Sequence, residues 1–302
     1  MSARGLVRAL ATLGVLVVLW GGFVLFRGSL ADPASRLPLP TLSETELDGL
    51  DVIGPAETLR LARSGAGWTV NGYAAEADQV RKLLAAIADT AVSSELVARS
   101  PASHARLGVD AAGRRVVFRG AGDTLLDLVV GSSGTGFQSV YARLAGADDV
   151  YQVRGPLGAL VSRDAASWRD RRIAAVAADS VGTITIRHGR AETVLTRAGD
   201  AWTVAGEPAD TAAVRRLLGA LADVRAVGFV SPAEADSLDF SRPDRRLTVL
   251  GRGADTLLDL LVDSTEAGFR ARAGGRPDAF QLDFWRVNDL TPPAAALRGT
   301  VP

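Results

Sequence analysis

The sequence predicts an α+β protein with two tandem copies of one antiparallel-sheet-plus-helix domain after a single N-terminal transmembrane helix. Three observations predict this: a long internal repeat, period-two alternation of apolar and polar residues between glycine turns, and one apolar run near the N-terminus. Partner segments of the repeat lie about 130 residues apart, which is the length of a domain. They are Trp68–Val70 with Trp202–Val204, Val80–Leu84 with Val214–Leu218, Asp123–Leu128 with Asp255–Leu260, and Gly136-Phe137 with Gly268-Phe269.

We expect four parts along the chain. Residues 1–27 form a transmembrane anchor, residues 28–42 a proline-rich tether, residues 43–172 the first repeat domain and residues 173–302 the second. Because proline does not continue a helix, the tether should be extended.

The anchor is predicted from the uncharged run Ala9–Phe26. As a helix it spans about 27 Å, close to the thickness of a bilayer core. Basic residues precede it, which favours an N-terminus inside the cell. A cleaved signal peptide is the alternative, since Ser29-Leu30-Ala31 is a small-x-small site. Both interpretations place the bulk of the chain outside the cytoplasm, and the uncleaved anchor places it at the bacterial cytoplasmic (inner) membrane.

Each copy is predicted to begin with an antiparallel meander that leads into a helix. The apolar residues Val80, Leu83, Leu84 and Ile87 recur at helical spacing, as do their partners in the second copy. This spacing gives one apolar stripe that faces a sheet. A basic pair falls on the opposite face each time, either as a solvated surface or as a contact with a partner. These candidate contact residues are Arg81, Lys82, Arg215 and Arg216.

A hairpin after the helix carries an aspartate in the middle of an apolar strand. If Phe118 pairs with Thr124, Arg115 falls opposite Asp127. In the second copy, pairing of Val249 with Thr256 places Arg246 opposite Asp259. We therefore predict two equivalent cross-strand ion pairs, Arg115–Asp127 and Arg246–Asp259, each worth about 0.2–1 kcal/mol.

A second hairpin follows in both copies, and the segment Pro156–Arg172 then predicts a helix. It ends in Trp168-Arg169-Asp170-Arg171-Arg172, for which the second copy offers no full counterpart. We interpret this segment as the connector between the domains.

The order of these motifs resembles the bacterial family called domain of unknown function 4340. The motifs are the membrane helix, Gly-Trp-Thr-Val, Leu107-Gly108-Val109-Asp110, Val150–Val153 and Trp168–Arg172. The resemblance covers about residues 50–290 and implies an association with ABC-type export or gliding-motility-type transport systems. The second copy departs from the pattern, since Leu238-Asp239-Phe240 replaces Leu107–Asp110.

Composition excludes several classes of site. Lys and Arg number 34, as do Asp and Glu, so the formal net charge is zero and argues against a nucleic-acid surface. There is no cysteine, and the two histidines, His104 and His188, lie in predicted loops and do not recur between copies. A catalytic triad or a zinc site is therefore not expected, and no cofactor is predicted.

Other chemical motifs also have plainer interpretations. The stretch Gly131–Gly136 lacks the Gly-Lys-Ser/Thr ending of a phosphate loop and joins two strands, so it predicts a hairpin turn. Paired acids such as Glu234 and Asp236 lie in polar segments without a recognisable cleft, and the repeated tryptophans are expected in the core.

The sequence leaves three functions open. The first is a single-pass membrane-anchored, extracytoplasmic accessory or scaffold protein that is not an enzyme and contacts the permease or ATPase of an ABC transporter. The second is a binding module for cell-wall glycan or another envelope ligand, which would use the groove between the copies. The third, a hydrolase, requires an acidic residue whose loss abolishes turnover without affecting stability.

Overall fold

The computed structural model describes Trp20 and residues 36–65, 67–236 and 238–299. The chain divides into two compact units at the bond between Trp168 and Arg169. The boundary predicted from the sequence, between Arg172 and Ile173, lies later in the chain.

Unit 1 contains an antiparallel nine-stranded sheet with the order β4-β3-β2-β1-β6-β7-β8-β9-β5. Both edges are formed by strands that sequence analysis did not identify as such. The strands are β1 (Gly49–Ile53), β2 (Thr58–Ser64), β3 (Gly67–Val70), β4 (Tyr73–Ala74), β5 (Ser94–Ala98), β6 (Arg114–Gly120), β7 (Asp123–Ser133), β8 (Ser139–Leu144) and β9 (Val150–Arg154).

Unit 2 contains a second nine-stranded antiparallel sheet, with the order β14-β13-β12-β11-β17-β18-β19-β20-β16. This order matches that of unit 1 strand for strand. The strands are β11 (Val181–His188), β12 (Ala191–Ala198), β13 (Ala201–Val204), β14 (Glu207–Pro208), β16 (Gly228–Phe229), β17 (Arg245–Gly251), β18 (Thr256–Thr265), β19 (Gly268–Ala273) and β20 (Ala279–Leu282). A separate two-stranded sheet pairs β10 (Arg172–Ala174) with β15 (Val224–Arg225).

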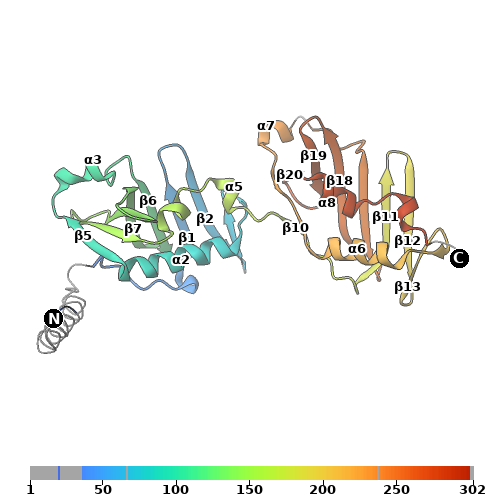
Figure 1. Ribbon diagram of the computed structural model, residues 1–302, viewed down its shortest axis with the longest axis horizontal. Coiled ribbons are helices and arrows are strands. Elements are labelled where there is room, and N and C mark those ends of the chain that lie inside the picture. The colour runs from blue at the N-terminus through green and yellow to red at the C-terminus, as the bar shows by residue number, and fades with distance from the viewer. Residues whose placement is uncertain (1–19, 21–35, 66, 237, 300–302) are drawn as a thin grey trace, which may run out of the picture. The chain divides into compact units, whose positions relative to one another are not determined.

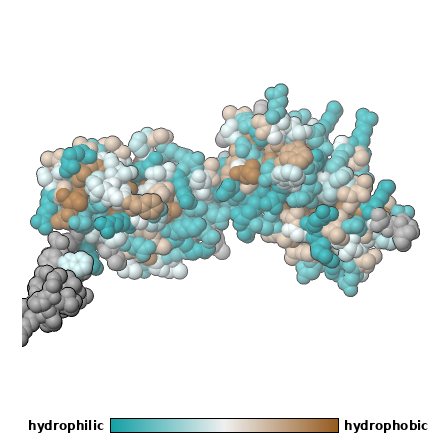
Figure 2. Space-filling view, viewed as in Figure 1, coloured by the Kyte–Doolittle hydropathy of each residue, from teal (hydrophilic) through white to brown (hydrophobic). Residues whose placement is uncertain are grey.

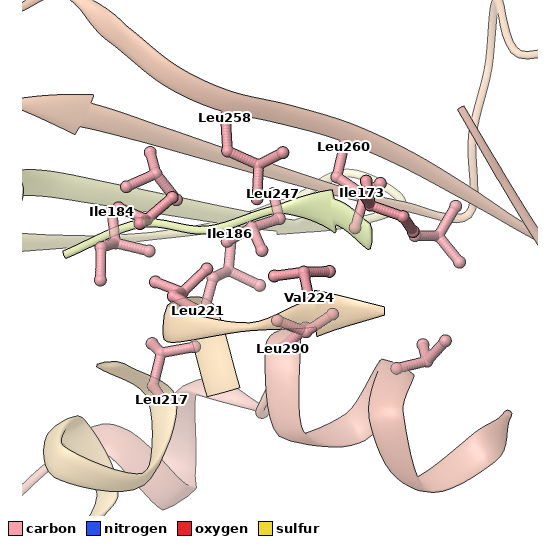
Figure 3. Packing of buried hydrophobic residues seen from close by; sticks show 14 of the residues in the cluster. Ile173, Ile184, Ile186, Leu217, Leu221, Val224, Leu247, Leu258, Leu260 and Leu290 are labelled. Atoms are coloured by element: carbon pink, nitrogen blue, oxygen red, sulfur yellow. The ribbon is translucent and has the colours of Figure 1, made fainter. Parts of the chain in front are cut away.

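One long helix covers a face of each sheet, as the apolar stripe predicts. These helices are α2 (Ala77–Val92) and α6 (Thr211–Ala222) (Figure 1). In α2, Val80, Leu83 and Ile87 are buried in the same core as the strands. Figure 3 shows the corresponding packing in unit 2, where Leu217 and Leu221 of α6 face Ile184, Ile186 and other core residues.

Short helices complete both units. Unit 1 has α3 (His104–Leu107), α4 (Leu157–Val161), α5 (Ala165–Trp168) and the 3₁₀ turns η2 (Glu44–Glu46) and η3 (Pro101–Ser103). Unit 2 has α7 (Pro232–Ala235), α8 (Phe284–Leu290) and α9 (Ala294–Leu297).

The predicted connector helix over Pro156–Arg172 is wrong. The segment forms α4 and α5, which belong to the core of unit 1 through Leu157, Leu160 and Trp168. Unit 2 does have a counterpart, because α8 and α9 follow β20 as α4 and α5 follow β9. Large buried side chains on both helices explain why this segment packs on its own sheet instead of bridging two domains.

The end of this segment closes each unit against its long helix. The amide of Glu76, which precedes α2, donates to the carbonyl of Trp168 at 2.8 Å. The amide of Asp210, which precedes α6, donates to the carbonyl of Leu297 at 2.9 Å. The last residue of α5 and the last residue of α9 therefore occupy equivalent places.

The described part of the predicted tether lies on unit 1. Leu37 is buried, its amide donates to Ser94 Oγ at 2.8 Å, and Leu39 and Leu42 pack against the same core. The predicted tether over residues 28–42 is therefore too long, because leucines between its prolines bury apolar surface.

The predicted anchor, Ala9–Phe26, lies outside the described residues except for Trp20. Among the residues that the structure describes, no helix is long and apolar enough to span a bilayer. The visible face of both units is mostly hydrophilic, with small hydrophobic patches between polar residues (Figure 2).

Candidate functional site

Arg115 and Asp127 form an ion pair on the sheet of unit 1. Arg115 Nε donates to Asp127 Oδ1 at 2.8 Å, and Nη2 donates to the other carboxylate oxygen. Arg246 and Asp259 repeat this two-pronged geometry in unit 2, with both contacts at 2.8 Å. Two parallel hydrogen bonds to a carboxylate are the strongest arrangement open to a guanidinium, so each pair fastens two neighbouring strands.

The predicted strand register is wrong, although the side chains still meet. Asp127 lies opposite Val117, and Arg115 lies opposite Val129. In unit 2, Asp259 lies opposite Thr248 and Arg246 opposite Leu261. The members of each pair are thus diagonal neighbours on one face of the sheet, within reach of a long side chain.

In both sheets a bulge and the turn next to it together produce this shift. Phe118 pairs with Leu126 while Arg119 pairs with Thr124, which leaves Leu125 as an extra residue. In unit 2, Leu257 is the extra residue. In unit 1, a two-residue turn with positive φ at Ala121 and Gly122 closes the hairpin, and such turns fix a register that the sequence prediction did not include.

The two ion pairs differ in their surroundings. Thr248 Oγ1 also donates to Asp259 Oδ1 at 3.2 Å, whereas Val117 holds the equivalent position in unit 1. The hydrogen bonds from Arg246, joined by the one from Thr248, hold the pKa of Asp259 below its usual value. Each arginine's pKa is raised by its hydrogen bonds to the aspartate, so both guanidinium groups stay charged at neutral pH.

The predicted basic pairs lie on the solvent face of the long helices. Arg81 and Lys82 on α2 and Arg215 and Arg216 on α6 are all exposed. Arg81 forms an ion pair with Asp78 one turn earlier. The other three cations make no side-chain ion pair with any described residue. The faces also carry small exposed residues such as Ala85 and Gly219, which leave the charged groups open to solvent.

A buried charge cluster in unit 2 was not predicted. The carboxylate of Asp278 is almost fully buried and forms ion pairs with Arg169 and, at 3.1 Å, with Arg276. The guanidinium carbon of Arg169 lies 3.7 Å from the centroid of Phe229, and that of Arg276 lies 5.2 Å from Phe280. The first arginine of the Trp168–Arg172 motif is thus a packing element of unit 2. Nothing in the sequence around Asp278 signals this role.

The histidines differ from the loop positions expected for them. His104 begins α3, and its Nε2 lies 2.9 Å from the carbonyl oxygen of Asp148. His188 ends β11, with Nε2 3.0 Å from the carbonyl oxygen of Thr291. Burial, reinforced by the charge of Arg245, lowers the pKa of His188, so its ring is neutral at pH 7.

The acidic residues of the described chain do not gather into a metal site. No group of three or more histidine and acidic side chains that could hold a metal ion occurs there. Glu234, expected as a solvated loop acid, lies in α7 and forms an ion pair with Arg270 at 2.7 Å.

Two aromatic side chains of α8 lie on the surface of unit 2. Trp285 is 77% exposed and Phe284 55% exposed, with ring centroids 5.6 Å apart in an edge-to-face arrangement. The repeated tryptophans behave differently. Trp68 is buried, Trp202 is half-buried against the core, and each is stacked with an arginine of the neighbouring strand, Arg63 or Arg197.

These features define a two-unit α+β protein whose paired charges fasten its sheets and whose helix faces are open. The family model described as domain of unknown function (DUF4340) matches residues 45–243, which include most of unit 1 and more than half of unit 2. The chain belongs to this family. No curated protein and no solved structure matches it.

Proposed function

We propose that this protein is a single-pass membrane-anchored accessory or scaffold protein of a bacterial transport system. In this proposal residues 9–26 cross the inner membrane, and the two units, as tandem copies of one domain, lie outside the cytoplasm. They act through contact with the permease subunits of an ABC-type or gliding-motility-type system, and through the permease they associate with its ATPase; they do not act through catalysis.

The basic helix face, present at the same place in both units, is the observation that carries this proposal. Lys82, Arg215 and Arg216 are exposed and have no ion partner among the described residues. A charged surface of this kind favours association with a surface of opposite charge and sets the rate and specificity of docking. We infer that the partner presents acidic residues to α2 and α6.

Co-purification from native membranes tests the proposal. The full chain is cross-linked, extracted in mild detergent and analysed by mass spectrometry, alongside a variant with R81Q, K82Q, R215Q and R216Q. We expect the wild-type chain to recover transporter subunits in stoichiometric amounts and the variant to lose them. A control variant with R60Q, R106Q, R190Q and R242Q loses the same charge from exposed positions away from the long helices and should retain the partner. Recovery of the wild-type chain alone would contradict the proposal.

A second candidate function, binding of cell-wall glycan, is favoured by Trp285 and Phe284. A large exposed aromatic surface marks an interaction site, and the flat face of tryptophan packs well against a sugar ring. We expect the full chain to sediment with purified cell-wall glycan and W285A to lose this ability. F137A removes another highly exposed aromatic, in unit 1, and serves as the control. Equal sedimentation of all three proteins would exclude a role for Trp285.

A further inference from the structure

Unit 1 contains a pocket of about 580 Å³ that none of the preceding functions uses. It lies where the start of β6, the end of β7, the start of β8 and helix α4 meet. The Gly131–Gly136 stretch, predicted as a hairpin turn, forms the end of β7 as far as Ser133 and the start of the turn to β8, and it contributes to the pocket wall. The volume falls within the range of about 300–1,000 Å³ that is typical of small-molecule sites.

Arg114 is the single charged residue among the 18 that line this pocket. It is half-buried, and within the described ranges its side chain has no ion pair and no hydrogen bond. The guanidinium lies against the backbone of Gly54, where any side chain would collide with it. Ser132, Ser133 and Ser162 also line the pocket, and their hydroxyls make no hydrogen bond to a described residue. The pocket thus offers donors and one positive charge, and its lining has no carboxylate.

The equivalent arginine of unit 2, Arg245, already has hydrogen-bond partners within the protein. Arg114 lies opposite Val130 and Arg245 opposite Val262, so the two hold the same place in matching hairpins. Arg245 Nη1 donates to Asn288 Oδ1 at 2.9 Å and to Thr291 Oγ1 at 3.0 Å. Its guanidinium also lies 5.4 Å from the ring centroid of Phe269.

Smaller residues in unit 1 leave the matching space open. Val140 takes the position of Phe269, and not Phe137 as the sequence repeat predicted. Ala142 pairs with Val130 as Ala271 pairs with Val262, and Val140 and Phe269 each lie two residues before that alanine. Helix α4 lines the pocket with Gly158 and Ala159, where α8 supplies Asn288. The side chains that satisfy and cover the arginine in unit 2 are therefore absent from this position in unit 1.

We propose that this pocket binds a small molecule through an oxyanion, a carboxylate or a phosphate group, that pairs with Arg114. A planar guanidinium forms two parallel hydrogen bonds with either group, and the serine hydroxyls supply further donors. The ligand takes the place that Asn288, Thr291 and Phe269 fill around Arg245.

Titration of the ¹⁵N-labelled full chain with inorganic phosphate and, separately, with acetate tests this site. Ionic strength is held constant with chloride, and the amide signals of Ser132 and Ser133 are followed. We expect saturable shifts with at least one anion, and affinity weaker by about tenfold or more in R114Q, because a charge-assisted hydrogen bond is lost. R106Q removes an exposed arginine of the same unit that lies outside the pocket and should bind as the wild type does.

Each outcome of the titration either supports the anion site or overturns it. Saturation by phosphate alone or by acetate alone supports the site and identifies the chemical group that it prefers. Absence of saturable shifts with both anions, or equal loss of affinity in R114Q and R106Q, overturns the proposal. R114K keeps the charge without the planar fork, so its weaker binding would separate hydrogen-bond geometry from charge.

Discussion

The two units share a strand order but differ in the surroundings of one equivalent arginine. In unit 2, Arg245 is held by Asn288 and Thr291 and covered by Phe269. In unit 1, Arg114 has no such partners among the described residues and faces a pocket. The same strand order is thus compatible with a partnered arginine and with one that faces a pocket, because the residues that differ lie at the end of the sheet and not in its shared core.

What the two units keep in common is the set of contacts that fixes the fold. Both have the diagonal Arg–Asp pair, the bulge beside it, and the carbonyl that closes the long helix. The ion pair and the bulge lie within one hairpin, whereas the carbonyl contact joins segments that are distant in the sequence. Comparing equivalent variants in the two units therefore distinguishes the contacts that stabilise both units from those that stabilise only one.

The largest expected effect is at Trp168, whose side chain is fully buried in unit 1. We expect W168A to cost unit 1 about 3–5 kcal/mol, since a large cavity is left in a packed core. W168F should cost less, because the lost indole N–H has no hydrogen-bond partner in the described structure. Hydrogen exchange with mass spectrometry reports on each unit separately, and equal loss of protection in both units would show that the effect is not confined to unit 1.

Asp278 should give the next largest effect, in unit 2. D278N removes the charge that compensates Arg169 and Arg276, and breaking a buried ion pair costs about 3 kcal/mol or more. Asp149 stands at the matching position of unit 1 and makes no ion pair with a described residue, so D149N should stay within about 0.5 kcal/mol of the wild type. Urea unfolding measures both variants, and equal destabilisation would contradict the difference drawn between the units.

The helix caps give a smaller difference. Asp210 accepts a hydrogen bond from the amide of Ala213 at 2.7 Å at the start of α6, whereas the side chain of Glu76 makes no such bond at the start of α2. We expect D210A to lower the free energy of unfolding of unit 2 by about 1 kcal/mol and E76A to lower that of unit 1 by less. Thermal unfolding of the two variants compares the caps, and a larger loss in E76A would reverse their order.

The smallest expected effect is the pH dependence of the Arg246–Asp259 pair. The pKa of Asp259 is lower in the folded protein than in the unfolded chain, so its stabilisation is present above the unfolded value of about 3.9 and is lost as the pH falls through the folded pKa. The free energies of unfolding of the wild type and D259N should therefore differ by about 1 kcal/mol or less at pH 7 and converge below pH 4. A gap that persists at the lowest pH would assign the stabilisation to packing and not to charge.

Much of this architecture was predictable because its signals are periodic. The apolar stripes of α2 and α6 and the alternation in the hairpins specify elements that pack on one face, and the structure contains them. Strand β1 was missed because Asp51 interrupts its apolar run, and the structure satisfies that buried aspartate with an ion pair to Arg119 at 2.7 Å. The edge strands β4 and β14 have two residues each, too few to show a period.

The sites were harder to predict because they depend on register and on side chains brought together from far apart. The bulges at Leu125 and Leu257 change which residues are opposite without changing the hydrophobic pattern. The replacement of Val109 by Phe240 was visible in the sequence, but its consequence was not. Arg143 binds the carbonyl of Val109 at 2.7 Å, whereas the equivalent Arg272 stacks over the ring of Phe240.

The short outer strands have a further consequence for a chain that carries the same sheet twice. Every strand of one sheet has a counterpart at the same position in the other sheet. Pairing of a strand with the wrong sheet during synthesis is therefore a route to misassembly and aggregation. The outer strands β4, β14 and β16 have two residues each, and Pro208 in β14 lacks an amide hydrogen, so these edges offer an incoming strand few hydrogen bonds. Brevity at these edges therefore favours pairing of each strand within its own sheet as the chain leaves the ribosome.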